Sequence, residues 1–571
     1  MSRTLALSTA LLLLSAHLIL CAEALRVPIV TDQQRAVPPT KPSSQRGTTH
    51  GNAPPLGDPS YCTFPTPTYS LQLPNPLPVA LQEALQRADQ RAAALFAQNG
   101  TAGMHVSVVY NQQVLFSRGY GQVHMDSSSA ASSVAPPSPP PDADTIFRVG
   151  SLTKLFTVLM LLHLRDHHRV SLETELKSLL PNYHTPNPWQ TDRGITLRML
   201  ASHTSGMTRM IQCDSPCNYT DSQMLEYIAT FPLLFPPDTY AHYSDAAFAL
   251  LARALQSVTP LSMEDYIREN ILTPLGMNST GFDFTEAVKA RMATGYNVED
   301  PNNPIPVVKG EPNLGWMSGS AQMYSSPADL QKLVSFFCRY DRAAGYGQPL
   351  DGVTLREFFS PQFVNTDASN FDGYGLAWEF LTGVPGLGSL PFLSKNGGDG
   401  AEFGFDAQLQ WAVRQKLGVI VLLSEAPSTL ELDVTNAVLS EVFPVIDDLY
   451  FAHALQNSLP DQYTNLLGTF QGADITVDVT VEVMPYYNNT EQLKISYNHG
   501  EVEYALLTSA INGDTFRFCR LAPLGPISCE RMEGGVGSDV NEYVRFTLDD
   551  NELAVSLRLP NSNLIYNRVK Q

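Results

Sequence analysis

The order of strand-like and helix-like segments constrains the fold of this chain more than any other feature. The segment His105–Phe116 alternates apolar and polar residues around a turn, which is typical of two paired strands. Helical patterns dominate from Ser151 to about Lys289, and strand-like segments return at Gln408–Val413 and Leu417–Leu423. The chain therefore enters a sheet early and completes it late, which predicts an α/β (α+β) domain with an inserted helical subdomain.

The last part of the chain has a different pattern. After about Ser458, short alternating segments are separated by turns, as in Ile475–Val483 and Tyr543–Leu548. A chain of 571 residues also exceeds what one hydrophobic core usually serves. We therefore predict a β-rich C-terminal domain, with antiparallel strands, over residues 458–571.

The first residues have the pattern of a secretory signal peptide. An apolar run, Leu5–Leu20, follows Arg3, and Ala22-Glu23-Ala24 fits the small-residue cleavage pattern. We place the cut after Ala24, which predicts a signal peptide over residues 1–24 and a secreted protein. The alternative is an uncleaved signal anchor at the membrane, because the run approaches the ~20 residues of a membrane helix. No later segment of the sequence is long enough to span a bilayer.

Two further regions lack the pattern of a packed core. Residues 25–75 are rich in proline and serine and predict an extended segment. Residues 126–144 are a Ser/Ala/Pro-rich stretch that predicts a flexible insertion within the main domain, which we place at residues 76–447.

Six cysteines remain after the predicted cleavage, an even number that an oxidising compartment favours. Cys213 with Cys217 and Cys519 with Cys529 are natural pairs by their closeness in sequence, which leaves Cys62 to reach Cys338. The sequence does not fix this connectivity. The chain also has four Asn-x-Ser/Thr glycosylation sites, at Asn99, Asn218, Asn278 and Asn488.

Composition and charge exclude two classes of protein. Apolar residues make up 43% of the chain and charged residues 16%, which is a globular composition and excludes global disorder. The formal net charge of −20 opposes binding to nucleic acid and to anionic membrane surfaces, because both need a basic surface.

A serine and a lysine three residues apart mark the most chemically suggestive segment. Ser151 follows a strand end and a glycine and begins an apolar helical pattern, with Lys154 about one helical turn later on the same face. The ammonium of Lys154 can therefore reach the Ser151 hydroxyl, and the helix start offers backbone N–H groups to an oxyanion. Alone, this spacing also fits an ordinary helix cap with a surface lysine.

Further motifs follow in a fixed order. Tyr243-Ser244-Asp245 comes about 90 residues later, and Lys395-Asn396-Gly397-Gly398 precedes a strand near the end of the domain. With these motifs, the chain resembles the serine β-lactamase and penicillin-binding protein family, in the branch of class C β-lactamases, D-Ala-D-Ala peptidases and esterases. That family has S-x-x-K, then Y-x-N, then K-T-G or H-x-G. Other blocks of this family are also present, at Leu200–Met207, Pro274–Met277, Ser325–Leu330 and Tyr374–Trp378.

The resemblance implies a fold and a set of catalytic roles. The fold is a β-lactamase/DD-peptidase-like antiparallel sheet flanked by helices, and the C-terminal part resembles accessory domains of secreted eukaryotic relatives. Ser151 is the implied nucleophile, with Lys154 and Tyr243 as its proton-transfer partners. Lys395 is implied to attract a substrate carboxylate, and the N–H of Gly398 to join that of Ser151 in the oxyanion hole. His203, in the first block, is interpreted as structural support.

The chain departs from the family pattern at two positions in the site. Asp245 replaces the asparagine of Y-x-N, and an ionised aspartate accepts hydrogen bonds but cannot donate one to a substrate amide. It also favours protonated lysines nearby, so Tyr243 becomes the preferred base, and β-lactams or peptides become less favoured substrates. Asn396 replaces the usual threonine or serine of the third motif but keeps a polar donor in the substrate-binding region.

We therefore predict a serine hydrolase that forms an acyl-enzyme on a small-molecule or peptide ester or amide, without a cofactor. His163 and His167 stand four residues apart, but the glutamate of H-E-x-x-H is missing, so we predict no metal site. The motifs of α/β-hydrolases and phosphate-binding loops are absent from the sequence. The alternative function is a binding or scaffold protein that keeps the fold without turnover. The sequence identifies neither the substrate nor the oligomeric state.

Overall fold

The structure is a computed structural model of the whole chain. It describes the following residues: 73–100, 102–125, 138–189, 194–211, 217–300, 302–340, 348–365, 372–381, 384–387, 392–398, 400, 403–455, 465–472, 476–484, 490–497, 502–512, 515–520, 543–549, 553–559 and 564–569. The predicted signal peptide, most of the predicted Pro/Ser-rich extension and residues 126–137 of the predicted insertion lie outside this part.

An eight-stranded antiparallel sheet forms the centre of the main domain. Its strand order is β2-β1-β12-β11-β10-β9-β8-β7. In chain order the strands are β1 (Gly103–Tyr110), β2 (Gln113–Gly121), β7 (Phe363–Asn365), β8 (Asp372–Tyr374), β9 (Glu379–Leu381), β10 (Phe392–Asn396), β11 (Asp406–Ala412) and β12 (Leu417–Leu423). The early hairpin β1-β2 pairs with the late strand β12, so the chain does enter the sheet early and complete it late. The predicted fold class is confirmed.

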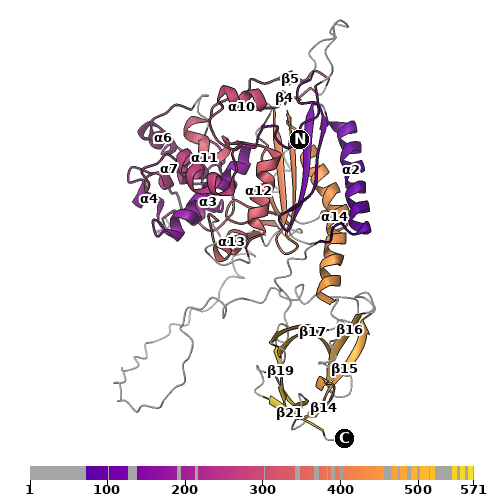
Figure 1. The fold of residues 1–571 in the computed structure, drawn as a ribbon. Coiled ribbons are helices and arrows are strands. Elements are labelled where there is room, and N and C mark those ends of the chain that lie inside the picture. The colour runs from indigo at the N-terminus through magenta and orange to yellow at the C-terminus, as the bar shows by residue number, and fades with distance from the viewer. Residues whose placement is uncertain are drawn as a thin grey trace, which may run out of the picture. The chain divides into compact units, whose positions relative to one another are not determined.

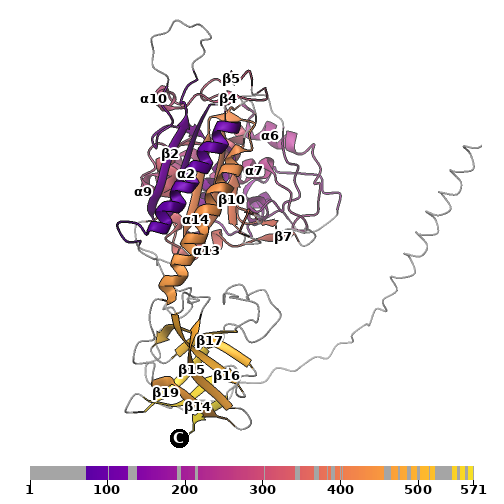
Figure 2. The ribbon, with the colours of Figure 1, turned by 90° about the vertical axis from the view of Figure 1, so that its right-hand side faces the viewer.

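Two long helices cover one face of the sheet. They are α2 (Val79–Asn99) and α14 (Leu430–Leu455), and they lie side by side over the strands (Figure 2). The buried residues of α2 include Leu81, Ala84, Leu85 and Ala88, a spacing of three and four that places an apolar stripe on one side of a helix. This stripe packs with the apolar side chains of β1, β12 and α14 in one core.

The inserted helical block covers the opposite face (Figure 1). Its buried centre is α3 (Thr153–Asp166), in which 11 of the 14 residues are buried, and such a helix can only lie inside a core. The other helices are α4 (Leu176–Leu179), α5 (Leu197–Ala201), α6 (Asp221–Ile228), α7 (Asp245–Gln256), α8 (Met263–Ile267), α9 (Thr273–Leu275), α10 (Glu286–Arg291), α11 (Ser318–Ala321), α12 (Pro327–Phe337) and α13 (Gly352–Phe358), with the short turns η2 (Gly150–Leu152), η3 (Arg268–Leu272) and η4 (Gly315–Met317).

Two small sheets connect the helical block to the central sheet. One pairs β3 (Phe147–Arg148) with β6 (Tyr324–Ser325), and the other has the order β13-β4-β5. The latter strands are β4 (Tyr296–Asn297), β5 (Ile305–Pro306) and β13 (Glu425–Ala426). The pair β3-β6 leads directly into the segment that carries Ser151, so it positions the start of α3.

The C-terminal strands close into an antiparallel barrel. They are β14 (Gly468–Gln471), β15 (Thr476–Met484), β16 (Thr490–Tyr497), β17 (Val502–Asn512), β18 (Thr515–Arg520), β19 (Tyr543–Leu548), β20 (Ala554–Leu559) and β21 (Leu564–Arg568). The barrel closes because β21 pairs back onto β14. Phe470, Val477, Leu557 and Tyr566 are among its buried side chains. In the described part of the chain, no helix is apolar and long enough to cross a membrane.

Candidate active site

Ser151 lies in a tight turn between a strand end and a buried helix. Gly150 has φ +47°, a conformation that favours glycine, and it turns the chain from β3 into η2. The hydroxyl of Thr153 donates to the carbonyl of Gly150 at 2.6 Å and accepts from the N–H of Met323 at 3.1 Å, which fixes the turn. Ser151 itself is 8% exposed, so its hydroxyl is held at the start of the helical segment with limited access to water.

Lys154 is fully buried and contacts the serine directly. Its ammonium donates to Ser151 Oγ at 2.8 Å, to Asp245 Oδ1 at 2.5 Å and to the carbonyl oxygen of Ser320 at 3.0 Å. Burial alone would lower the pKa of Lys154, but the charge of Asp245, with that of Tyr243, outweighs burial and raises the pKa above its ordinary value. Lys154 is therefore held as a cation at neutral pH.

Tyr243 approaches the same serine from the other side. Its hydroxyl donates to Ser151 Oγ at 2.9 Å and accepts from the ammonium of Lys395 at 3.3 Å. The ammonium groups of Lys154 and Lys395 each lie 4.9 Å from the centroid of the Tyr243 ring, and the guanidinium of Arg209 lies 5.1 Å from it. Three cationic groups therefore lie against the Tyr243 ring.

His203 supports the tyrosine from behind. Its ring is stacked on that of Tyr243, with centroids 4.3 Å apart and planes 24° from parallel. Its Nδ1 accepts the backbone N–H of Ser244 at 3.0 Å, and burial, with the charges of the nearby lysines, lowers its pKa well below the ordinary value. The imidazole is therefore neutral and adds no fourth charge to the tyrosine. The structure agrees with the structural role predicted for His203.

Lys395 is also buried and paired with a carboxylate. It projects from β10 and donates to Glu379 Oε1 at 2.8 Å, across the pairing of β9 with β10. Burial alone would lower the pKa of Lys395, but the charge of Glu379, with Tyr243 and the hydrogen bonds to both, raises it above its ordinary value. Its charge is thus already matched by Glu379, whereas the sequence predicted that it would attract a substrate carboxylate.

The third motif has an internal hydrogen-bond network. Asn396 donates from Nδ2 to Glu431 Oε1 at 3.1 Å, and its Oδ1 accepts the backbone N–H of Gly398 at 2.8 Å. The predicted second oxyanion donor, the N–H of Gly398, is therefore engaged by Asn396 in this structure. Burial raises the pKa of Glu431 to about 7, so this carboxyl group changes charge near neutral pH.

Gly397 allows the third motif to approach the nucleophile turn. A Cβ on this residue would lie 2.2 Å from the carbonyl oxygen of Val149, two residues before Ser151. Only glycine fits at this contact, so the backbones of the two motifs touch directly.

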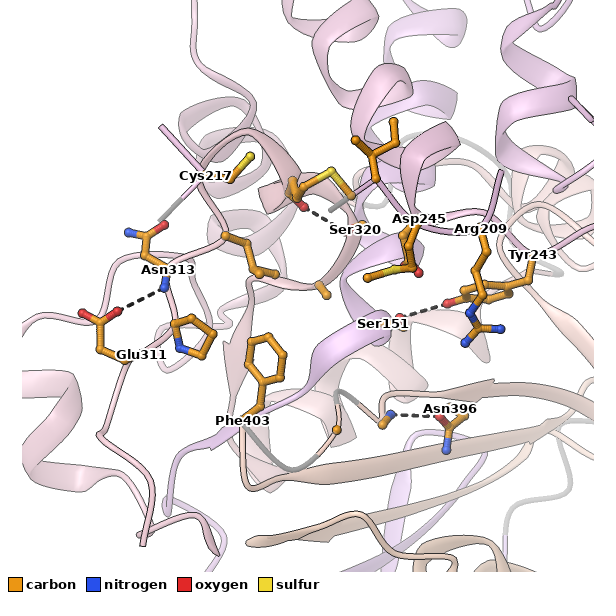
Figure 3. A pocket seen from close by; sticks show the side chains of 18 of the residues that line it. Ser151, Arg209, Cys217, Tyr243, Asp245, Glu311, Asn313, Ser320, Asn396 and Phe403 are labelled. Carbon is orange, nitrogen blue, oxygen red and sulfur yellow. Dashed lines mark hydrogen bonds between the residues drawn. The ribbon is translucent and has the colours of Figure 1, made fainter. Parts of the chain in front are cut away.

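A pocket of about 1610 Å³ opens above these residues. Ser151 lies between its two ends, with Arg209 and Tyr243 on one side and Phe403, Glu311 and Asn313 on the other (Figure 3). Val307, Val308, Leu314 and Met317 also line the pocket. The pocket therefore has the cation Arg209 beside the tyrosine, and an aromatic ring, a carboxylate and an amide beyond the serine.

The structure brings most of the predicted site residues together. Ser151, Lys154, Tyr243, Asp245 and Lys395 form one connected hydrogen-bond network, and Asn396 and Gly398 line the same pocket. Sequence reasoning missed two charged residues of the site. Glu379 follows the Tyr374–Trp378 block directly, and Arg209 follows the Leu200–Met207 block by two residues, so closeness to a family block was the available signal.

Predictions away from the site are tested only in part. Cys217 is buried and disulfide-bonded, and the buried thiol of Cys338 donates to the carbonyl oxygen of Lys416 at 3.8 Å. The structure leaves the pairing a prediction, since Cys62, Cys213, Cys529 and the side chain of Cys519 lie outside its description. Asn99, Asn218 and Asn278 are exposed, as a glycan acceptor must be, and Asn488 lies outside the described residues.

The two helix histidines have other partners. His163 Nδ1 lies 2.8 Å from the hydroxyl of Tyr266, and His167 Nδ1 lies 2.8 Å from the carbonyl oxygen of His163. Among the described residues, no group of three or more histidine, cysteine, aspartate or glutamate side chains is placed to hold a metal.

Known proteins resemble this chain in sequence. It is 35% identical over 270 residues to the human protein "Putative beta-lactamase-like 1", covering 46% of this chain and 51% of that protein. It is 28% identical over 390 residues to "Beta-lactamase-like protein 2" of Dictyostelium discoideum, covering 66% of each. The "D-alanyl-D-alanine-carboxypeptidase/endopeptidase AmpH" of Escherichia coli is 28% identical over 359 residues, covering 60% of this chain and 84% of the relative. The match thus spans only half to two thirds of the first two relatives.

Solved structures share the fold. The octameric penicillin-binding protein homologue from Pyrococcus abyssi is 16% identical, with a TM-score of 0.52, covering 85% of this chain and all of that one. The β-lactamase/D-alanine carboxypeptidase from Yersinia pestis is 24% identical, with a TM-score of 0.51, covering 63% of this chain and 99% of that one. Residues 88–441, which hold every side chain of the site, match the family described as Beta-lactamase. The protein therefore belongs to the β-lactamase family.

Proposed function

We propose that the protein is a serine hydrolase that forms an acyl-enzyme on Ser151, with Tyr243 as the base. One observation carries this proposal: Ser151 Oγ lies 2.8 Å from Lys154 Nζ and 2.9 Å from Tyr243 Oη. Because Asp245 holds Lys154 as a cation, Tyr243 is the better acceptor for the serine proton.

The acylation step follows from this geometry. Once its own hydroxyl proton has been released to solvent, Tyr243 takes the proton of Ser151 while Oγ bonds to the substrate carbonyl carbon. The carbonyl oxygen becomes an oxyanion, and the backbone N–H of Ser151, in η2 just before α3, is its proposed donor. The bond to the leaving group then breaks, and Tyr243 returns the proton to the departing oxygen or nitrogen. In the second half, water attacks the acyl-enzyme by the same route and frees Ser151.

Two features favour an ester as the substrate over a peptide or a β-lactam. Asp245 lines the pocket where the family pattern has an asparagine, and a carboxylate cannot donate to a substrate amide. The N–H of Gly398 is bound to Asn396, so a substrate carbonyl must displace this contact to gain a second donor. Esters need less oxyanion stabilisation than amides because their leaving groups depart more readily.

Labelling with a fluorescent fluorophosphonate tests the catalytic proposal without knowledge of the substrate. We expect a single label, located on Ser151 by mass spectrometry, and no label in Ser151→Ala. A folded wild-type protein that is not labelled, together with a labelled Asp245→Asn variant, would instead support a binding protein that retains the fold without turnover.

We also propose that the protein is secreted. The signal-like pattern of residues 1–24 and the exposure of Asn99, Asn218 and Asn278 support this. Expression in animal cells should release the protein into the medium with its N-terminus at Leu25, and treatment with an N-glycosidase should reduce its mass. Recovery only in the membrane fraction with an intact N-terminus would support the signal anchor.

A further inference from the structure

The positive charges in and behind the pocket differ in whether a carboxylate neutralises them. Lys154 lies 2.5 Å from Asp245, and Lys395 lies 2.8 Å from Glu379, so each buried lysine has its own carboxylate. Arg209 also lines the pocket, but it is exposed, and among the described residues no carboxylate lies within ion-pair distance of its guanidinium. Arg209 is therefore the pocket cation best able to take up an acidic group from a ligand.

The backbone of Arg209 is fixed close to the reacting groups. Its carbonyl oxygen accepts the N–H of Asp245 at 2.8 Å, which ties the Arg209 loop to the start of α7. The guanidinium lies 5.1 Å from the centroid of the Tyr243 ring, and the hydroxyl of that ring is 2.9 Å from Ser151 Oγ. A planar guanidinium in this place can bind a carboxylate or phosphate with two parallel hydrogen bonds.

The position of Arg209 relative to Ser151 determines whether it contacts the acyl portion or the leaving group of the substrate. Tyr243 must return its proton to the leaving group, so the leaving group lies on the Tyr243 side of Ser151. Arg209 lies on this same side, whereas Phe403 lies on the other (Figure 3). The acyl portion is thereby directed to the end that holds Phe403, and the leaving group to Arg209.

We propose that Arg209 binds an acidic group on the leaving-group portion of the substrate. The inference rests on the proposed hydrolase function and narrows its substrate class to esters whose alcohol carries a carboxylate or a phosphate. The family resemblance assigned such a role to Lys395, but that lysine is neutralised by Glu379 at 2.8 Å. In this proposal, Arg209 in a loop takes the role of binding the substrate's acidic group, in place of Lys395 in the third motif.

Two matched esters test this inference. We would compare the hexanoyl ester of 3-hydroxybenzoate with that of methyl 3-hydroxybenzoate, which share an acyl chain and differ in one carboxylate on the leaving group. The wild type should have a kcat/KM about tenfold or more higher for the acid, as expected of a charge-assisted hydrogen bond. Arg209→Gln should lose this preference and still hydrolyse the neutral ester. Arg209→Lys should retain part of it.

Controls separate the possible failures. Arg268→Gln removes an exposed arginine that pairs with Asp265 outside the pocket, and it should keep the full preference. Equal turnover of both esters by the wild type, or an equal loss for both in Arg209→Gln, would overturn the role of Arg209 and leave the hydrolase intact. Absence of both fluorophosphonate labelling and turnover of either ester would instead overturn the hydrolase and this inference with it.

Discussion

A buried lysine paired with a carboxylate lies on each side of Tyr243, but the two pairs differ in their contact with Ser151. On the helical side, Lys154 from α3 pairs with Asp245 from α7, and on the sheet side, Lys395 from β10 pairs with Glu379 from β9. Both lysines are buried and have a raised pKa. Of the two lysines, only Lys154 contacts Ser151 directly, whereas Lys395 reaches it through Tyr243.

This difference separates the neutralisation of a buried lysine from its contact with Ser151. Removal of either carboxylate leaves a buried cation, yet only the change at Asp245 alters a group in hydrogen-bond contact with Ser151. Substitutions in the pair Lys154–Asp245 should therefore change the rate of acylation most. Substitutions in the pair Lys395–Glu379 should mainly change the charge next to Tyr243.

Lys154→Ala should have the largest effect of any change on either side. It removes a donor to Ser151 and leaves Asp245 without its cation, so we expect the rate of fluorophosphonate labelling to fall by about 10³-fold. The loss of an ion-pair partner should also lower the free energy of unfolding by roughly 3–5 kcal/mol. Labelling kinetics and urea denaturation measure the two effects. Lys395→Ala is the matched variant on the sheet side, and an equal or larger loss of rate there would contradict the comparison.

Glu431 accepts a hydrogen bond from Asn396 on the sheet side of the site, and Glu431→Gln tests whether this carboxyl group is protonated in the folded protein. Burial raises the pKa of this carboxyl group from 4.5 to about 7, so between these values the folded protein holds a proton that the unfolded chain releases. As the pH rises from about 4.5 to 7, the free energy of unfolding of the wild type should therefore fall. The fall should be roughly 3 kcal/mol larger than that of Glu431→Gln. Urea denaturation at several pH values measures this.

Glu441→Gln is the control. The hydrogen bond from Arg87 lowers the pKa of Glu441, so in the folded protein this carboxylate stays ionised and paired between pH 4.5 and 7. Parallel curves for the wild type and Glu431→Gln would show that Glu431 is not protonated in the folded state at pH 6.

Asp245→Asn should increase acylation by about tenfold at neutral pH. The charge of Asp245 keeps the pKa of Lys154 raised, so its removal lowers that pKa and makes Lys154 available as a second base. The pH profile of labelling should shift to lower pH in the variant. An unchanged profile would mean that the carboxylate acts on substrate choice alone.

Glu379→Gln should have the smallest effect on labelling, within about threefold, because its lysine does not touch Ser151. Without Glu379, however, the charge of Lys395 becomes available to an acidic leaving group. The double variant Arg209→Gln/Glu379→Gln should therefore hydrolyse the carboxylate-bearing ester faster than Arg209→Gln alone. A loss of labelling as large as that of Lys154→Ala would show that the two sides of Tyr243 are equivalent.

Much of the fold and the inner site could be predicted because the relevant patterns are local. Ser151 and Lys154 are three residues apart at a helix start, so a single turn brings them together. The segments predicted as strands near His105–Phe116 and Leu417–Leu423 became β1, β2 and β12, since their alternation reflects burial on a sheet. The order of the motifs then indicated Tyr243 and Lys395.

The remaining parts of the site depend on pairings that the sequence does not record. Glu379 reaches Lys395 only because β9 and β10 pair with Glu379 opposite Ser394. Arg209 reaches Tyr243 because its loop is hydrogen-bonded to the start of α7. The N–H of Gly398 was predicted to serve the oxyanion, but the side-chain conformation of Asn396 decides its partner.

The contact at Gly397 has a consequence for how this site can be redesigned. A Cβ there would lie 2.2 Å from the Val149 carbonyl oxygen, so the separation of the nucleophile turn from the third motif is a property of the main chain. Exchange of the side chains at positions 209, 245, 379 and 396 would leave this main-chain contact in place. A library of variants of this site should therefore leave position 397 unchanged.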